Sequence, residues 1–176
     1  MRLFWIAPPL AMALLMGCGD LPSLQGIANQ TNTVFDPALL GAWNGGDAVA
    51  IVRKGENNKY AISWLATNGT AEPQIVKLEA TLVQLGSERI VDMTGLEPGP
   101  FAIPCHIFLR VRPVKEGLKV QFIDSKWMRE KAKSLANFIE DGHPVLTGPS
   151  TDVEGFLKKF GFDEKALDEP LIFKRM

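Results

Sequence analysis

Cysteine and histidine are scarce in this chain, whose 176 residues include two of each. One cysteine, Cys18, directly follows an apolar leader. The remaining thiol and imidazole groups are Cys105, His106 and His143. Adjacent residues of a strand point to opposite faces, so Cys105 and His106 are not expected to bind one metal ion together. We expect no metal centre and no cofactor. Cys105 is then either a small buried apolar residue or a free thiol open to pairing with another molecule.

Signatures of common enzymes and of nucleic-acid binding are also lacking. The chain contains no G-x-S-x-G, no H-E-x-x-H and no glycine-rich phosphate loop. Its 19 basic and 20 acidic side chains nearly balance, and no basic stripe stands out. No internal repeat or low-complexity segment is visible. We therefore expect a protein that is not an enzyme and that does not bind nucleic acid.

A hydrophobic run long enough to span a membrane is missing as well. The uncharged run from Leu3 to Met16 has 14 residues, whereas a membrane-spanning helix needs about 20. Pro8 and Pro9 interrupt this run. A positive residue, Arg2, followed by a short apolar segment is typical of a secretory signal. We expect residues 1–17 to be a signal peptide that is removed.

The segment Leu15-Met16-Gly17-Cys18 resembles the lipobox of bacterial lipoproteins. In that family the cysteine thiol receives a diacylglyceryl group, the chain is cut before it, and the new amine is acylated, with chains such as palmitate. The resemblance implies lipidation of Cys18 and a durable membrane anchor, since each buried CH₂ contributes about 0.8 kcal/mol. The alternatives are an ordinary signal with a chance cysteine, or an uncleaved apolar N-terminus.

The residue after the cysteine bears on the choice of membrane. In enteric bacteria, aspartate directly after the cysteine retains a lipoprotein in the inner membrane. Here Gly19 takes that position and Asp20 follows. The resemblance therefore favours the outer membrane, facing the periplasm, over the inner membrane.

Residues 18–34 are small, polar or turn-forming without a period, which predicts a flexible tether behind the lipidated cysteine. Residues 35–176 are expected to form a single β-rich domain, long enough for a sizeable core. It opens with a helical turn over Pro37–Leu40, because Asp36 is a suitable N-cap and Gly41 a natural stop.

After this turn the apolar period changes to two, as in strands. The expected strands are Ala48–Lys54, Lys59–Thr67, Gln74–Leu85, Arg89–Thr94, Phe101–Arg112, Leu118–Asp124 and, at the end of the chain, Leu171–Arg175. Short links rich in Gly, Asn and Pro separate most of them. Strands joined in this way predict an antiparallel meander, which must close into a barrel or cover its edges.

Two C-terminal helices are expected to pack on this sheet. One covers residues 126–140 with Asp124 or Ser125 as its cap. The other covers residues 152–160, where Thr151 and Glu154 form a capping box and Gly161 a natural end. The link at residues 144–147 is either a short strand or an extended connection. The fold class is thus mainly β (α+β).

Gly41-Ala42-Trp43, between a helical turn and a strand meander, resembles the G-x-W signature of the lipocalins. In that family the tryptophan closes one end of an eight-stranded barrel and a late arginine packs across its ring. The resemblance implies a lipocalin-like barrel with Trp43 and Arg175 as structural residues. A broader likeness is to envelope lipoproteins of unassigned function. The alternative fold is a half-open curved sheet packed on the two helices.

Polar residues on the strands supply further candidates. One face of the strand Phe101–Arg112 carries Cys105 and belongs to the core, while the other carries His106 and Arg110. That second face is interpreted either as a solvated face or as an anion or headgroup site. Asp92 shares a face with Ile90 and is expected to be partly buried and paired with an arginine.

The inward face of the strand Lys59–Thr67 carries Tyr60, Ile62 and Trp64, which either pack in the core or line a ligand cavity. The candidate ligand-binding residues are Tyr60, Trp64, His106 and Arg110. We expect a lipid-anchored binding module for an apolar or amphipathic small molecule. The alternative is an accessory subunit that docks on an envelope protein and has no ligand cavity.

Overall fold

The computed structural model describes residues 22–66, 74–96, 104–124, 127, 130–132, 135–138, 144–161 and 163–176. The expected signal peptide, Cys18 and His143 lie outside these residues. The strands are β1 (Thr33–Val34), β2 (Gly41–Asn44), β3 (Ala48–Lys54), β4 (Tyr60–Ala66), β5 (Gln74–Leu85), β6 (Glu88–Gly95), β7 (His106–Val114), β8 (Gly117–Phe122), β9 (Ala136–Phe138), β10 (Pro144–Leu146) and β11 (Leu171–Arg175). The helices that lie wholly within the described residues are the 3-10 helices η2 (Pro37–Leu39) and η4 (Glu164–Ala166) and the α-helix α2 (Ser150–Phe160).

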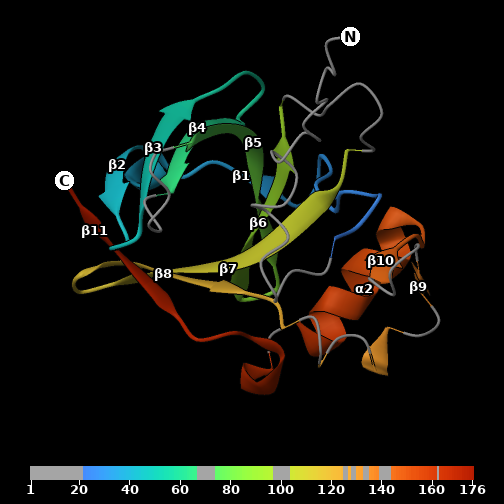
Figure 1. The fold of residues 1–176 in the computed structure, drawn as a ribbon. Coiled ribbons are helices and arrows are strands. Elements are labelled where there is room, and N and C mark those ends of the chain that lie inside the picture. The colour runs from blue at the N-terminus through green and yellow to red at the C-terminus, as the bar shows by residue number, and fades with distance from the viewer. Residues whose placement is uncertain are drawn as a thin grey trace, which may run out of the picture.

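Antiparallel strands close into a barrel in the order β2-β3-β4-β5-β6-β7-β8-β11 (Figure 1). The last strand, β11, pairs with β8 on one side and with β2 on the other. The long strand β5 pairs with β4 through its first part and with β6 through its second part, which joins the two ends of the sheet. The expected mainly β barrel is confirmed. A half-open sheet is wrong, because every barrel strand has two neighbours.

The strand predictions agree with much of this ring. β3, β5 and β11 have the predicted bounds, whereas β2 was not predicted as a strand. Pro104 precedes β7 and does not interrupt it. The helical turn before β2 is confirmed as η2, in which the Asp36 carboxylate accepts a hydrogen bond from the Ala38 N–H at 2.9 Å.

Alternate residues of the strands fill the barrel with a first hydrophobic core. Its buried members are Leu39 of η2 and residues at inward strand positions, which are Tyr60, Leu78, Ala80, Leu82, Val91, Met93, Leu109 and Val111. Burial of each large aliphatic or aromatic side chain stabilises the fold by roughly 1.5–3 kcal/mol. This core explains why the sequence alternates along these strands.

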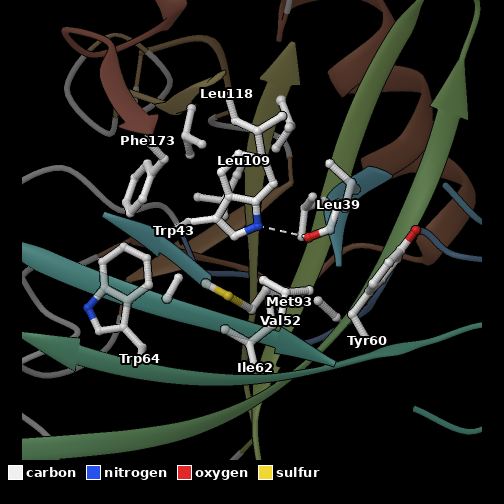
Figure 2. Close-up of a pocket in the computed structure, with 15 residues that line it drawn as sticks. Leu39, Trp43, Val52, Tyr60, Ile62, Trp64, Met93, Leu109, Leu118 and Phe173 are labelled. Carbon is white, nitrogen blue, oxygen red and sulfur yellow. Dashed lines mark hydrogen bonds between the residues drawn. The ribbon is translucent and has the colours of Figure 1, made fainter. Parts of the chain in front are cut away.

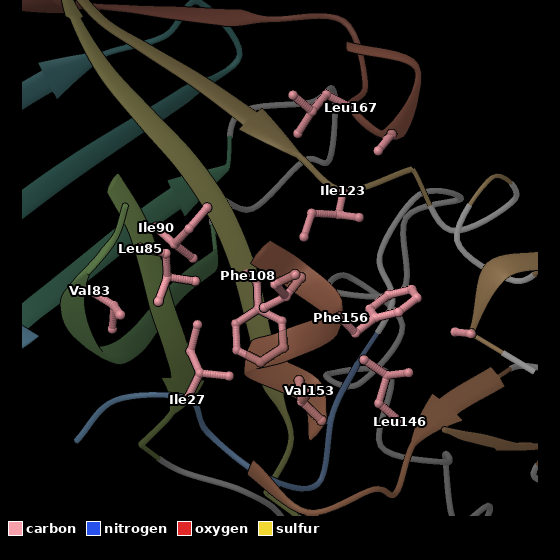
Figure 3. Packing of buried hydrophobic residues seen from close by; sticks show 13 residues of the cluster. Ile27, Val83, Leu85, Ile90, Phe108, Ile123, Leu146, Val153, Phe156 and Leu167 are labelled. Carbon is pink, nitrogen blue, oxygen red and sulfur yellow. The ribbon is translucent and has the colours of Figure 1, made fainter. Parts of the chain in front are cut away.

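A second hydrophobic core lies outside the barrel, between its wall and α2 (Figure 3). The outward residues of β5, β6 and β7 meet residues of α2 and Ile27 there, in a cluster that includes Val83, Leu85, Ile90, Phe108, Val153, Phe156 and Leu157. The strand face of His106 and Arg110 is therefore not solvated, since Phe108 and Arg110 are only 2% and 1% exposed. Where the barrel wall contacts α2, the sheet therefore carries apolar side chains on its outer face as well as on its inner face.

Residues 22–32, here called the N-terminal strap, are packed on the barrel wall. Ser23 and Ile27 are 0% and 1% exposed, and Asn32 is buried too. The strap pairs with β7, because Ser23 and His106 exchange backbone hydrogen bonds at 2.9 and 2.7 Å. It also pairs with β10 through Leu24 N–H and the Leu146 carbonyl at 2.9 Å. The flexible tether expected over 18–34 is thus wrong from residue 22 onward.

The helical predictions need two corrections. Within the predicted helix 126–140, residues Ala136–Phe138 form β9, which pairs with β10. One α-helix with defined bounds therefore packs on the barrel in the described residues, and not two. The expected capping box is also absent, because α2 begins at Ser150 with Pro149 at its N-cap and no side-chain cap. In the part of the chain that the structure describes, no helix has the length and apolar character needed to cross a membrane.

Candidate functional site

A tryptophan and an arginine pack together where the last strand, β11, pairs with β2. The Trp43 ring is buried, and its Nε1–H donates to the Leu39 carbonyl at 2.9 Å. The Arg175 guanidinium carbon lies 5.3 Å from the centroid of the Trp43 ring, and its Nη2 donates to the Leu40 carbonyl at 2.8 Å. Gly41 has φ +133°, and a Cβ there would lie 3.1 Å from that guanidinium. The G-x-W glycine thus leaves room for the arginine.

Next to Trp43, the barrel contains a small apolar cavity of about 90 Å³ (Figure 2). Its lining includes Leu39, Trp43, Ala50, Val52, Tyr60, Ile62, Trp64, Met93, Leu109, Leu118 and Phe173. Tyr60 and Trp64 both line it, and they also pack in the first core, so both interpretations of this strand face apply to them. The Tyr60 hydroxyl accepts from the Asp36 N–H at 2.7 Å, and burial raises the pKa of Tyr60. Trp64 packs against Phe173, with ring centroids 5.6 Å apart.

A second, polar pocket of about 280 Å³ lies on the outside of the barrel, between the strap and the wall. It is lined by Gly26, Ala28, Lys59, Glu79, Thr81, Asp92, Thr94 and His106. Register explains why these residues meet. Thr81 lies opposite Asp92, and Thr94 lies opposite His106, so outward positions of β5, β6 and β7 form one patch.

Asp92 and His106 form the centre of the polar pocket. The Asp92 carboxylate is buried, with Oδ1 2.6 Å from His106 Nδ1. Its Oδ2 accepts from the Ile27 N–H at 2.7 Å and from the Ala28 N–H at 3.2 Å. The hydrogen bond that His106 donates to Asp92 raises the pKa of His106, while burial and the Lys59 charge oppose that rise. Asp92 was expected to be partly buried beside an arginine, and its partner is instead a histidine.

Gly26 permits the strap to approach this pair. A Cβ at position 26 would lie 2.7 Å from His106 Cε1 and 2.8 Å from Asp92 Oδ2, inside any acceptable contact distance. The backbone of the strap therefore passes directly over the imidazole and the carboxylate. Sequence reasoning missed Gly26, because a glycine in a turn-rich stretch has no distinguishing pattern.

Two other parts of the polar pocket differ in whether their polar groups have partners. Lys59 Nζ lies 2.5 Å from Glu79 Oε1, so these two charges are paired. The Thr94 hydroxyl is buried and has no hydrogen-bond partner among the described residues. A buried hydroxyl without a hydrogen bond lowers the stability of the fold, so the unpaired hydroxyl of Thr94 is unusual for a native protein.

Arg110 does not belong to the polar pocket. Its buried Nη2 donates to Gln121 Oε1 at 2.6 Å and to Glu164 Oε1 at 2.8 Å, and this contact lowers the pKa of Glu164. Its Nε and Nη1 have no partner among the described residues. His106 and Arg110 are four strand positions apart, about 13 Å. The structure therefore does not bring them together into one anion site.

The four predicted ligand-binding residues thus fall in three places. Tyr60 and Trp64 face the interior, His106 faces the polar pocket, and Arg110 is buried on β7 with Gln121 and Glu164 as its partners. Among the other candidates, Asp124 caps a turn by accepting from the Trp127 N–H at 2.8 Å. Cys105 is a half-buried free cysteine, and burial raises its pKa.

Among the described residues, no group of three or more histidine, cysteine, aspartate or glutamate side chains could hold a metal ion. Comparison with protein-family models, with curated proteins and with solved structures found no match.

Proposed function

We propose that this protein is a non-catalytic binding module of the bacterial envelope, anchored through lipid on Cys18. Its barrel takes up a small apolar molecule, or the apolar end of an amphipathic one. The observation that carries this proposal is the apolar cavity of about 90 Å³ inside the closed barrel. Small eight-stranded barrels have room for packed side chains or for one small ligand, as in the lipocalins.

The cavity limits the size of the ligand. Pockets for drug-sized molecules measure about 300–1,000 Å³, and an apolar hole of roughly 150 Å³ can hold benzene. A slender unbranched group therefore fits better than a ring system. Met93 is the most adaptable residue of the wall, because an unbranched thioether side chain changes shape at low cost.

The packing of Arg175 across the ring of Trp43, the tryptophan of the G-x-W motif, supports a lipocalin-like arrangement with one closed end. Trp43 and Arg175 seal that end, so a ligand enters from the other. The export signal, the lipobox and Gly19 after the cysteine support a position on the outer membrane, facing the periplasm.

Mass spectrometry of the mature protein, gently purified from membranes, tests both parts of the proposal. A covalent increment on a chain that starts at Cys18 survives denaturation and reports the anchor. A second increment that disappears on denaturation reports a bound molecule. A clean apo mass with no uptake from a lipid extract contradicts the binding proposal and leaves the anchor intact.

A series of n-alcohols of increasing length measures the depth of the cavity. Each added CH₂ is expected to tighten binding about fourfold, until the chain no longer fits. Ala50→Leu, which places a larger side chain in the cavity, is expected to weaken binding at least about tenfold. Ala61→Leu on the exposed outer face of β4 is the matched control and leaves binding unchanged.

The alternative is an accessory subunit of an envelope complex. The observation that favours it is the small size of the cavity, together with exposed Ile51 and Ile75 on the outer wall. Under this alternative the protein shows no length-dependent alcohol binding, and crosslinking in intact cells recovers a defined partner.

A further inference from the structure

The polar pocket between the strap and the barrel wall has no part in the apolar cavity, and its use does not depend on the function proposed for the barrel. Its volume of about 280 Å³ is about three times that of the cavity inside. It contains no aromatic side chain other than the imidazole, so a stacked sugar or base is a poor fit. What it offers a ligand depends on which of its polar groups are already engaged.

The acidic groups of the polar pocket are engaged. Asp92 accepts three hydrogen bonds, from His106 and from two N–H groups of the strap, which occupies both its oxygens. Glu79 is paired with Lys59 at 2.5 Å. A cation entering the pocket would have to compete with these donors.

The groups that remain are mainly donors. His106 uses Nδ1 to contact Asp92, and no described residue bonds its Nε2. Thr94 stands directly opposite His106 on the neighbouring strand, and its hydroxyl is buried without a partner. Lys59 has further N–H donors beyond its bond to Glu79. The imidazole of His106 and the hydroxyl of Thr94 therefore lie on adjacent strands of one pocket with hydrogen-bonding capacity unused.

Asp92 fixes the tautomer of the imidazole. A carboxylate at Nδ1 orients the ring and favours the imidazolium, in which Nε2 also carries a proton. With His106 protonated, the charges that face the pocket are two positive (His106 and Lys59) and two negative (Asp92 and Glu79), so the lining is neutral. With His106 neutral, the lining is net negative and repels an anion.

We propose that the polar pocket binds a small oxyanion, a phosphate or carboxylate group, held by the Nε2–H of protonated His106 and the hydroxyl of Thr94. Lys59 adds positive charge at the rim. Because the imidazolium is required, the affinity falls about tenfold for each pH unit above the pKa of His106 in the folded protein. By the same linkage, bound anion raises the pKa of His106 further.

The test is a titration of the mature protein, kept in detergent, with inorganic phosphate and separately with acetate. Nitrogen NMR of the imidazole reports binding, and the second histidine of the sequence, His143, supplies an internal reference. We expect a saturable shift of the His106 signals at pH 6 and a raised pKa at saturating anion. A shift that is linear in concentration, or equal at His143, indicates an adventitious ion only and overturns the proposal.

Substitutions distinguish a specific anion site from a general effect of charge on anion binding. Thr94→Val keeps the shape of the side chain and is expected to weaken phosphate binding about tenfold, with unchanged thermal unfolding or a slight stabilisation. Thr151→Val on the exposed start of α2 is the matched control and leaves binding unchanged. His106→Gln should abolish saturable binding. Binding that persists in His106→Gln overturns the proposal.

Vesicles distinguish the source of the anion. The protein is placed in vesicles of neutral phosphatidylcholine, or of the same lipid with anionic phosphatidylglycerol. A His106 shift in the anionic vesicles that free phosphate competes away supports a lipid headgroup as ligand. A shift with free phosphate and none in either vesicle supports a soluble anion. No shift in any of these conditions contradicts the site.

Discussion

Asp92 joins three parts of the chain that are far apart in sequence. Its carboxylate is bonded to Ile27 and Ala28 of the strap, 65 and 64 residues away, and to His106 on the next strand. Hydrogen bonds to a charged group contribute about 1.5–3 kcal/mol each when they are buried. A single acidic side chain therefore fixes both the strap and the imidazole.

The His106–Asp92 contact predicts a pH dependence of stability. Because the pKa of His106 is raised on folding, the pair contributes its full stability below the ordinary value of 6.5 and loses it as the pH rises through the folded pKa. We expect the free energy of unfolding of the native protein, relative to His106→Gln, to fall by about 1 kcal/mol between about pH 6 and pH 9. Denaturant unfolding at several pH values measures it.

His143→Gln is the control for this measurement, since it removes the same titrating group elsewhere in the chain. Its pH profile should match that of the native protein. A native profile that is flat relative to His106→Gln contradicts the contribution of the pair.

The partial burial of Asp92 could be predicted from the sequence, whereas its hydrogen-bond partner could not. The period of two on β6 placed Asp92 beside Ile90 on one face and so indicated a partly buried acid. Its partner could not be predicted, because the pairing of β6 with β7 and the path of the strap are set by contacts between distant residues. The same limit explains why Arg110 and His106 were grouped, although Glu164 of η4 engages Arg110.

At the scale of elements, the strap behaves as a part of the folded domain. Ile27 contributes to the second core beside Val83 and Phe108, and Asn32 donates to the Ile27 carbonyl at 2.9 Å. Its small and polar composition gave no periodic signal, because the strap is held by backbone hydrogen bonds to β7 and β10 and not by an amphipathic face.

A pair of isoleucine substitutions tests this description. Ile27→Ala removes a side chain that is 1% exposed and is expected to lower the free energy of unfolding by about 2–4 kcal/mol. Ile75→Ala on β5, where the side chain is 67% exposed, should change it by less than about 0.5 kcal/mol. Chemical denaturation measures both. Equal effects would mean that the strap is a tether after all.

The helical errors have a related cause. The apolar spacing over 126–140 is compatible with a helix, but residues 136–138 pair with β10, and β10 pairs with the strap. Such long-range pairing overrides local preference. At α2, Glu154 forms an i,i+4 ion pair with Lys158 at 2.7 Å instead of a capping box.

At the scale of the whole molecule, β11 completes the barrel. It supplies Phe173 to the interior and carries Arg175 across the Trp43 ring, and it pairs with strands from both ends of the meander. The alternation of Leu171–Arg175 predicted a strand, and the lipocalin resemblance implied the arginine. The size of the cavity could not be predicted, because it depends on how fifteen lining side chains pack together.

Removal of β11 should therefore have a larger effect than loss of its arginine. Deletion of residues 171–176 leaves β2 and β8 as open edges, and we expect aggregation and loss of the cooperative thermal transition. Arg175→Ala keeps the strand and is expected to cost about 1–2 kcal/mol, from one ring contact and one hydrogen bond. Size-exclusion chromatography and thermal unfolding distinguish the two. A monomeric, cooperatively folded deletion variant contradicts the role of β11.

Given the anchor proposed at Cys18, the packed strap also limits the distance between the barrel and its membrane. Pro22 comes four positions after Cys18, and an extended chain covers at most about 3.6 Å per position, or roughly 14 Å in all. With the lipid proposed on Cys18, the barrel would stay within about 14 Å of its own bilayer and would not reach a distant membrane. Under this proposal, its encounters with ligands would be a two-dimensional search, governed by lateral diffusion and by the density of molecules in that leaflet.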